Sequence, residues 1–93
     1  MRHHPNRDAP KGHPDRLALD KAEDIAAALD DARCDMGLSQ RELALTLGYS
    51  DQYVSKTLNK PRNLALSTIF RFAHALGLEV RITVKPKKVN YAH

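Results

Sequence analysis

The 93-residue chain is long enough for one small domain and too short for several. No stretch of it approaches the ~18 consecutive apolar residues of a membrane-spanning helix. The single cysteine, Cys34, excludes an internal disulfide and fits a reducing, cytoplasmic setting.

The net charge of +4 is unevenly spread along the chain. Residues 17–49 carry three basic and seven acidic side chains, whereas residues 50–93 carry eight basic and two acidic ones. This asymmetry favours a polyanionic partner on the C-terminal half. From charge alone, an ordinary dipolar small protein is an equally good interpretation.

Residues 1–16 contain three prolines, three histidines and almost no apolar side chains. This composition predicts a disordered basic tail, and it lacks the apolar stretch of a secretory signal. Two alternatives stay open, a flexible arm that touches phosphate groups and a metal site at His3, His4 and His13. Disorder is favoured over a metal site because such a tail fixes no geometry.

The next segment has helical periodicity from Asp20 to Met36, with Asp20 and Glu23 resembling an acidic capping box. Its inward stripe is expected to comprise Ile25, Leu29, Ala32 and Met36. Gly37 is expected to end this helix, and Leu38 to make the hydrophobic contact just beyond it. The opposite face is acidic, which indicates a solvated surface that points away from nucleic acid, at Glu23, Asp24, Asp30, Asp31 and Asp35.

Residues 39–60 read as two short helices joined by a tight turn. Ser39 and Glu42 form a capping box, Gly48 ends the first helix, and Ser50 caps the second. The second helix should turn Val54 and Leu58 inward. Its outward face is then polar, with groups suited to base edges in a major groove, at Ser50, Asp51, Gln52, Tyr53, Ser55, Lys56 and Asn59.

Pro61 ends this second helix, and a loop through Asn63 follows. Helical periodicity resumes at residues 66–76. Most of the apolar side chains in this segment fall on one broad stripe, at Leu66, Ile69, Phe70, Ala73 and Leu76. Phe72 falls outside that stripe, so we expect it to be exposed or to face a second subunit.

Residues 78–85 alternate strictly between apolar and polar side chains, which predicts a β-strand that ends at Pro86. A lone strand cannot satisfy its own backbone groups. No other segment reads as a convincing strand, so the simplest solution is pairing with the same strand of a second copy. Val80, Ile82 and Val84 would then be the dimerisation residues of a homodimer.

The stretch 39–60 resembles the helix-turn-helix of the lambda-repressor-like (XRE-type) family, and residues 63–80 look like that family's next helix. The matching positions of the motif are Gln40, Leu43, Ala44, Leu47, Gly48, Val54 and Leu58. Tyr49 departs from the pattern, since the family more often has a small β-branched residue there. The resemblance covers residues 20–86. It implies a mainly α fold, a lambda-repressor-like bundle of four to five helices with a C-terminal β-strand that pairs across a dimer. The expected domain is residues 17–86, between the tail and a basic C-terminal tail at 87–93.

The resemblance also implies a sequence-specific DNA-binding transcriptional regulator, most simply a repressor, bound as a homodimer to an inverted repeat in double-stranded DNA. The expected base contacts are Ser50, Gln52, Tyr53 and Lys56. The expected phosphate contacts are Gln40, Ser55, Asn59, Lys60, Arg62 and Asn63.

Two settings suit a domain of this size, a mobile-element repressor and the antitoxin of a toxin–antitoxin operon that also binds its protein toxin. The competing class is a protein-interaction module with the same fold that does not bind DNA. An enzyme is not expected, because the sequence has no paired nucleophile and base, no glycine-rich phosphate loop and no metal-ligand spacing. We therefore expect no cofactor, no metal, no membrane association and a cytoplasmic, nucleoid-associated location.

Overall fold

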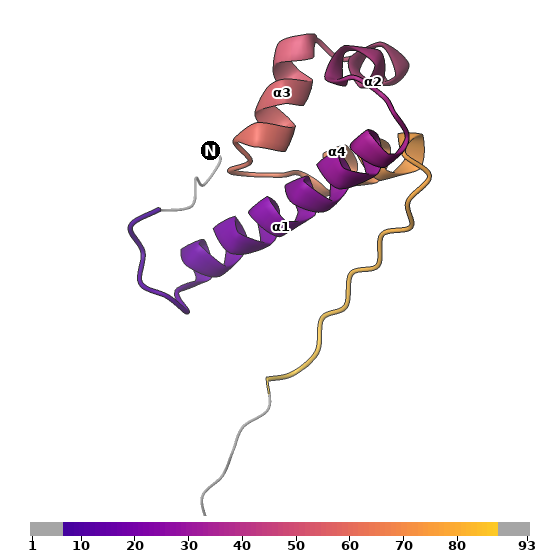
Figure 1. The fold of residues 1–93 in the computed structure, drawn as a ribbon. Helices are drawn as coiled ribbons and strands as arrows, with labels where there is room; N and C mark the ends of the chain where they lie inside the picture. Colours follow the sequence, from indigo (N-terminus) through magenta and orange to yellow (C-terminus); the bar gives the residue numbers. More distant parts are fainter. Residues whose placement is uncertain (1–6, 88–93) are drawn as a thin grey trace, which may run out of the picture.

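The computed structural model describes residues 7–87, and in this part of the chain it contains four helices and no strand. The helices are α1 (Pro14–Asp35), α2 (Gln40–Leu47), α3 (Asp51–Asn59) and α4 (Leu66–Ala75). Figure 1 shows the α2–α3 pair above the long α1, with α4 behind it. The mainly α architecture is as the sequence predicts. None of the helices described is long and apolar enough to cross a membrane.

Helix α1 begins at Pro14, so the predicted start at Asp20 is wrong by six residues. Proline suits the first helical position because its fixed φ is already helical and its missing N–H would be unpaired there anyway. The cap is His13, whose Nδ1 accepts the amide of Asp15 at 3.0 Å. Arg16 pairs with Asp20 one turn later at 3.2 Å. The last residues of the expected 1–16 tail therefore belong to this helix, while residues 1–6 lie outside the described chain.

The buried face of α1 extends further toward its amino end than predicted. Leu19, Ala22 and Ala26 are buried along with Leu29, at helical spacing. Ile25 and Ala32 pack against the core from the margin. Met36 is 52% exposed, contrary to its predicted inward position, because it caps the helix after the last turn. Gly37 follows at φ 71°, and Leu38 packs on the core as predicted.

The core gathers one or more buried side chains from each helix around Phe72, which has no exposed surface. The prediction for α4 is therefore wrong at two aromatic positions: Phe72 is central, and Phe70 is 46% exposed. Leu66, at 59% exposed, is also outside the core. Apolar residues cover more than half of the circumference of α4, so which of them face inward depends on the side chains that pack against the helix. The buried side chains of this core are Leu29, Leu43, Ala44, Val54, Leu58, Phe72, Ala73 and Leu76.

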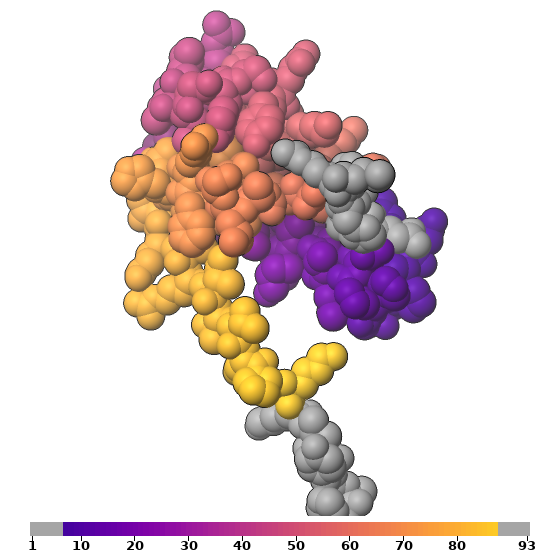
Figure 2. Space-filling model, turned by 180° about the vertical axis from the view of Figure 1, so that it is seen from behind, coloured from indigo at the N-terminus to yellow at the C-terminus, as the bar shows by residue number. Residues whose placement is uncertain are grey.

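The segment after Gly77 leaves the bundle as an extended chain rather than as a paired strand. Figures 1 and 2 show it projecting away from the helices. Val80 packs against the core, but Ile82 is 55% exposed and Val84 is 92% exposed. The predicted ladder needs a second chain, so pairing across a dimer stays a prediction. Most of the predicted 87–93 tail lies outside the described residues.

Candidate nucleic-acid interface

The amino end of α2 is held by the predicted capping box. The Glu42 amide donates to Ser39 Oγ at 3.0 Å, and the Ser39 amide donates to Glu42 Oε1 at 2.9 Å. The bond from the Ser39 amide, followed by that from its side chain, lowers the pKa of Glu42 below its ordinary value. Gln40 occupies the first helical position, half-exposed beside the unpaired amides of the first turn. The capping box thus fixes where a phosphate contact through Gln40 would lie.

The turn between α2 and α3 depends on Gly48, whose φ of 74° is left-handed. Glycine adopts that conformation without the steric cost of a Cβ atom. The amide of Tyr49 donates to the Ala44 carbonyl at 3.0 Å, which closes the end of α2. Leu43 and Ala44 have no exposed surface, because α3 packs directly across them. This packing fixes the orientation of α3 relative to α2.

Helix α3 divides into a buried and a polar side as predicted. Val54 and Leu58 face the core. The outer side has a shallow hollow of about 560 Å³ that no apolar residue lines. Gln52 and Lys56 are exposed there. The lining is Asp51, Gln52, Ser55, Lys56, Asn59 and Lys60. The structure therefore brings the predicted amide and ammonium donors together on one accessible face.

Several of the predicted contact residues already use their side chains within the chain. Ser50 Oγ accepts the Tyr53 amide at 3.1 Å and so caps α3. Asn59 Nδ2 donates to Ser55 Oγ at 3.1 Å. Each of these side chains keeps other hydrogen-bonding capacity, since a hydroxyl can still donate and the Asn59 oxygen can still accept.

Tyr53 lies at the border of the polar face rather than at its centre. Its hydroxyl is 3.1 Å from Thr68 Oγ1 on α4, and Tyr53 itself is 41% exposed. The centroids of the Tyr53 and Tyr49 rings are 4.7 Å apart. The phenol group is therefore turned toward α4, which the sequence pattern of α3 alone did not reveal.

A second hollow, of about 590 Å³, connects α3 with the amino end of α4. Lys56 and Lys60 line both hollows, and Arg62 and Asn63 extend the lining along the loop. Within residues 7–87, the side chains of Lys56, Lys60 and Arg62 form no ion pair. Helix α4 begins here without a side-chain cap, since its N-cap residue is Ala65. The predicted phosphate contacts of the loop thus continue the basic edge of α3.

The acidic side of α1 borders the carboxyl end of α3 but does not line its outer hollow. Glu23, Asp30 and Asp31 line a small hollow against the carboxyl end of α3, and none of them lines the outer hollow of α3. Asp30 is paired with Arg33 at 2.9 Å. Asn59 lines both hollows, so the acidic side of α1 and the basic edge of α3 meet at this residue. Cys34 is an exposed free thiol.

Two contacts of Tyr49 behind α3, one with Phe72 and one with Arg71, were missed from the sequence. Tyr49, the residue that departs from the family pattern, stacks on Phe72 with centroids 5.9 Å apart and planes at 27°. Arg71 Nη1 donates to the Tyr49 hydroxyl at 3.3 Å, which raises the pKa of the guanidinium. The only available signal was the unusual tyrosine in the turn, because the partners are 22 and 23 residues away.

The arrangement is suited to recognising a polyanion. Donors and cations converge on one exposed helix and the loop after it, as groove and phosphate contacts require. In the part of the chain that is described, no three His, Cys, Asp or Glu side chains lie close enough to hold a metal ion.

Comparisons with known proteins agree with this geometry. Residues 29–82 match the family model described as helix-turn-helix, HTH_3. A search of curated proteins finds no match.

Among solved structures, the chain is similar to a chain of the HipB–O1–O2 complex, with a TM-score of 0.61 and 28% identity over 68% of this chain and 91% of that one. A chain of the HipA–HipB–O2–O3 complex gives the same score and identity over 70% of this chain and 92% of that one. A hypothetical transcription factor from Neisseria, NHTF, is 37% identical over 75% of this chain and 76% of that one, with a TM-score of 0.59.

Proposed function

This chain belongs to the helix-turn-helix family HTH_3, and from that premise we propose that it is a sequence-specific DNA-binding transcriptional regulator, most simply a repressor. The observation that carries the proposal is the outer face of α3, where Gln52 and Lys56 are exposed in a hollow lined by polar and charged residues. A major groove about 12 Å wide admits a helix presented in this way.

In this proposal the side chains of α3 read base edges. Gln52 pairs with adenine through its amide, and Lys56 donates to guanine O6 and N7. Ser50 adds a hydroxyl donor beside them, and the ring of Tyr53 contacts a sugar or a thymine methyl group from the border of the face.

Phosphate contacts would flank the helix on both sides and fix its register in the groove. Cations release condensed counterions when they reach a phosphate, so each one makes binding more sensitive to salt. The proposed phosphate contacts are Gln40, Ser55, Asn59, Lys60, Arg62 and Asn63.

We further propose that the regulator acts as a homodimer on an inverted repeat. The extended segment 78–85 supports this, because its backbone lacks a ladder partner within the described chain and its apolar residues Ile82 and Val84 are exposed. Two α3 helices related by a two-fold axis would enter successive major grooves if they stood roughly 34 Å apart.

A toxin–antitoxin operon is the favoured setting. The HipA–HipB–O2–O3 complex contains a protein similar to this one together with a second protein. By extension, a small basic toxin would bind the acidic side of α1, none of whose carboxylates lines the outer hollow of α3. Co-purification with the product of the neighbouring reading frame tests this, and its absence would favour a plain repressor. In either setting the protein would act in the cytoplasm, at the nucleoid.

The test of DNA binding is a mobility-shift titration with the DNA upstream of the protein's own reading frame, at several salt concentrations. The proposal predicts preference over a scrambled duplex at every salt concentration where complexes form. No preference at any salt concentration would favour the alternative, a protein-interaction module that keeps the fold without binding DNA.

A further inference from the structure

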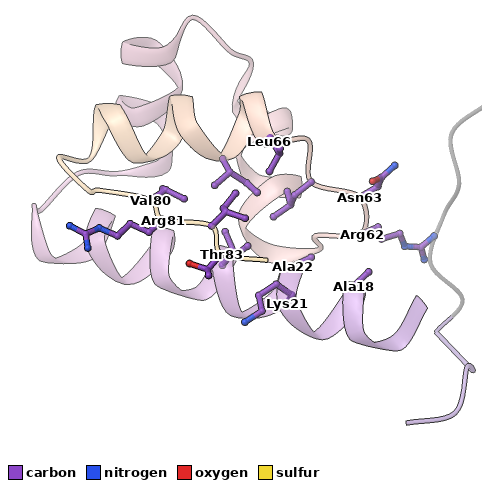
Figure 3. A pocket seen from close by; sticks show the side chains of 13 residues that line it. Ala18, Lys21, Ala22, Arg62, Asn63, Leu66, Val80, Arg81 and Thr83 are labelled. Atoms are coloured by element: carbon purple, nitrogen blue, oxygen red, sulfur yellow. The ribbon is translucent and has the colours of Figure 1, made fainter. Parts of the chain in front are cut away.

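The segment that follows α4 forms one wall of an apolar groove. The groove has a volume of about 630 Å³ and lies between α1, the start of α4 and residues 80–83. Figure 3 shows the segment passing α1, with Val80, Arg81 and Thr83 on it and Leu66 on α4 opposite. Ala22, Ile25 and Ile69 contribute apolar surface inside. An unpaired extended segment beside such surface is a template for a second chain.

The side chains of this segment already alternate as they would in a strand. Glu79 and Arg81 lie on the same side, because an ion pair of 3.2 Å joins them. Residues two apart share a face only when the backbone is extended. Val80 packs on the core from the other side. The polar face therefore carries Glu79 and Arg81, and the apolar face carries Val80, with Ile82 next on it.

We propose that a second copy of the chain pairs with this segment in antiparallel fashion, in one register whose two-fold axis passes through Ile82. The proposal rests on the homodimer of the proposed function and specifies its interface. Directly opposed residues of an antiparallel pair point to the same face, so an axis through a residue keeps apolar opposite apolar. This axis places Ile82 opposite itself and Val80 opposite Val84 of the second copy.

The charged residues on the polar face favour this register over its neighbours. With the axis at Ile82, Glu79 lies opposite Lys85 of the second copy, and the symmetric contact repeats the pair. Arg81 lies opposite Thr83, so no like charges meet. Opposite charges stabilise a cross-strand pair, and like charges destabilise it.

The neighbouring registers each bring like charges together. An axis at Arg81 sets two guanidinium groups opposite each other. An axis at Thr83 sets Arg81 opposite Lys85, and it places Val80 opposite Pro86, which has no N–H to donate to a ladder.

An axis at Val80 satisfies charge but conflicts with the fold. It would pair Glu79 with Arg81 of the second copy, which is favourable. It would also set Leu76 opposite Val84, although Leu76 is 4% exposed and caps α4. Among the axes at residues 80–83, only the axis at Ile82 satisfies both the charges and the described fold.

The test is a charge-reversal cycle measured as the dimer dissociation constant by sedimentation. E79K and K85E should each weaken the dimer, because each sets like charges across the ribbon. The double variant E79K/K85E restores both pairs and should recover roughly two- to thirtyfold in dissociation constant relative to either single variant. E79R/R81E has the same net charge as the wild type but leaves two cations opposed, so it should stay weak. Recovery by E79R/R81E, or none by E79K/K85E, would overturn the register.

Disulfide trapping gives a second readout in a C34S background, which removes the exposed native thiol. I82C should cross-link two copies on mild oxidation, because opposed Cα atoms in such a pair lie about 4.5–5.5 Å apart, within disulfide range. V80C alone should not, whereas V80C mixed with V84C should. Dimers that bind DNA but cross-link through V80C alone would overturn the register and leave the proposed function standing. A chain that stays monomeric and binds no DNA would overturn both.

Discussion

The hydroxyl of Tyr53 on α3 lies 3.1 Å from Thr68 Oγ1 on α4, and this bond joins the proposed recognition helix to the helix that follows it. Thr68 is only 8% exposed, so its hydroxyl depends on Tyr53 for a partner. The bond therefore helps to set how α3 is presented, apart from any contact that the Tyr53 ring makes with DNA.

Removing either hydroxyl should cost stability through this bond. Y53F and T68V should each lower the free energy of unfolding by about 0.5–1.5 kcal/mol, the usual net contribution of such a bond. The double variant should lose less than the sum of the two, because both changes break one interaction. Urea denaturation of the wild type, the two single variants and the double variant gives the four free energies of unfolding. Strictly additive losses would mean that the contact contributes nothing in solution.

Because Phe72 is buried and Phe70 is half-exposed, alanine substitutions at these two positions of α4 should differ in their effect on stability. F72A should destabilise the fold by about 3–5 kcal/mol, because it empties the centre of the core. F70A is the matched control, and it should cost about 0.5 kcal/mol or less in the monomer, as surface changes do. Thermal unfolding at low protein concentration compares them. Equal losses, or a larger loss for F70A, would contradict the position of Phe72.

The capping box predicts a specific pH dependence of stability. Because folding lowers the pKa of Glu42 below its ordinary 4.5, its carboxylate stabilises the fold at and above that pH, and the contribution is lost as the pH falls further. E42Q should therefore be less stable than the wild type at neutral pH, and the gap should close in acid. Unfolding midpoints at pH 7 and pH 3 measure the gap. E23Q, which changes an exposed glutamate of α1, controls for the loss of one charge. A gap that does not narrow in acid would contradict the bond.

Base contacts and phosphate contacts should differ in their response to salt. K60A and R62A should each reduce the slope of log affinity against log salt by about one unit, and they should weaken all sequences alike. Q52A should instead cost about 1–3 kcal/mol of discrimination between the preferred and a mutated half-site. K21A, which removes a cation from α1, is the matched control for charge. Fluorescence anisotropy over a salt series separates these outcomes, and a K21A slope as shallow as that of K60A would argue against local phosphate contacts.

The helix-turn-helix was the most predictable part of the chain, because its signals are local. Ser39 with Glu42, Gly48 and Ser50 each act within four residues, and the structure has all of them in the predicted roles. The same local reasoning placed Gln52 and Lys56 on the exposed side of α3. Whether they contact DNA stays a prediction.

The errors arose where distant packing or a competing local signal decides the structure. Helix α1 has one cap signal at Asp20 and another at His13 with Pro14, and the earlier one prevails because Leu19 and Ala22 also find buried positions. Phe72 is buried in a core drawn from all four helices, and Tyr49, 23 residues earlier, stacks on its ring. The strand at 78–85 is a different case: it stays a prediction, because its ladder requires a second molecule.

The central claim is that the outer face of α3 reads a DNA sequence, and selection from a random pool of duplexes tests it most directly. The wild type should enrich an inverted repeat with half-sites centred roughly 34 Å apart. The Q52A/K56A variant, which changes only exposed side chains, should lose or alter the preferred bases within each half-site. Enrichment of the same sequence by both proteins, or of none by the wild type, would contradict the claim.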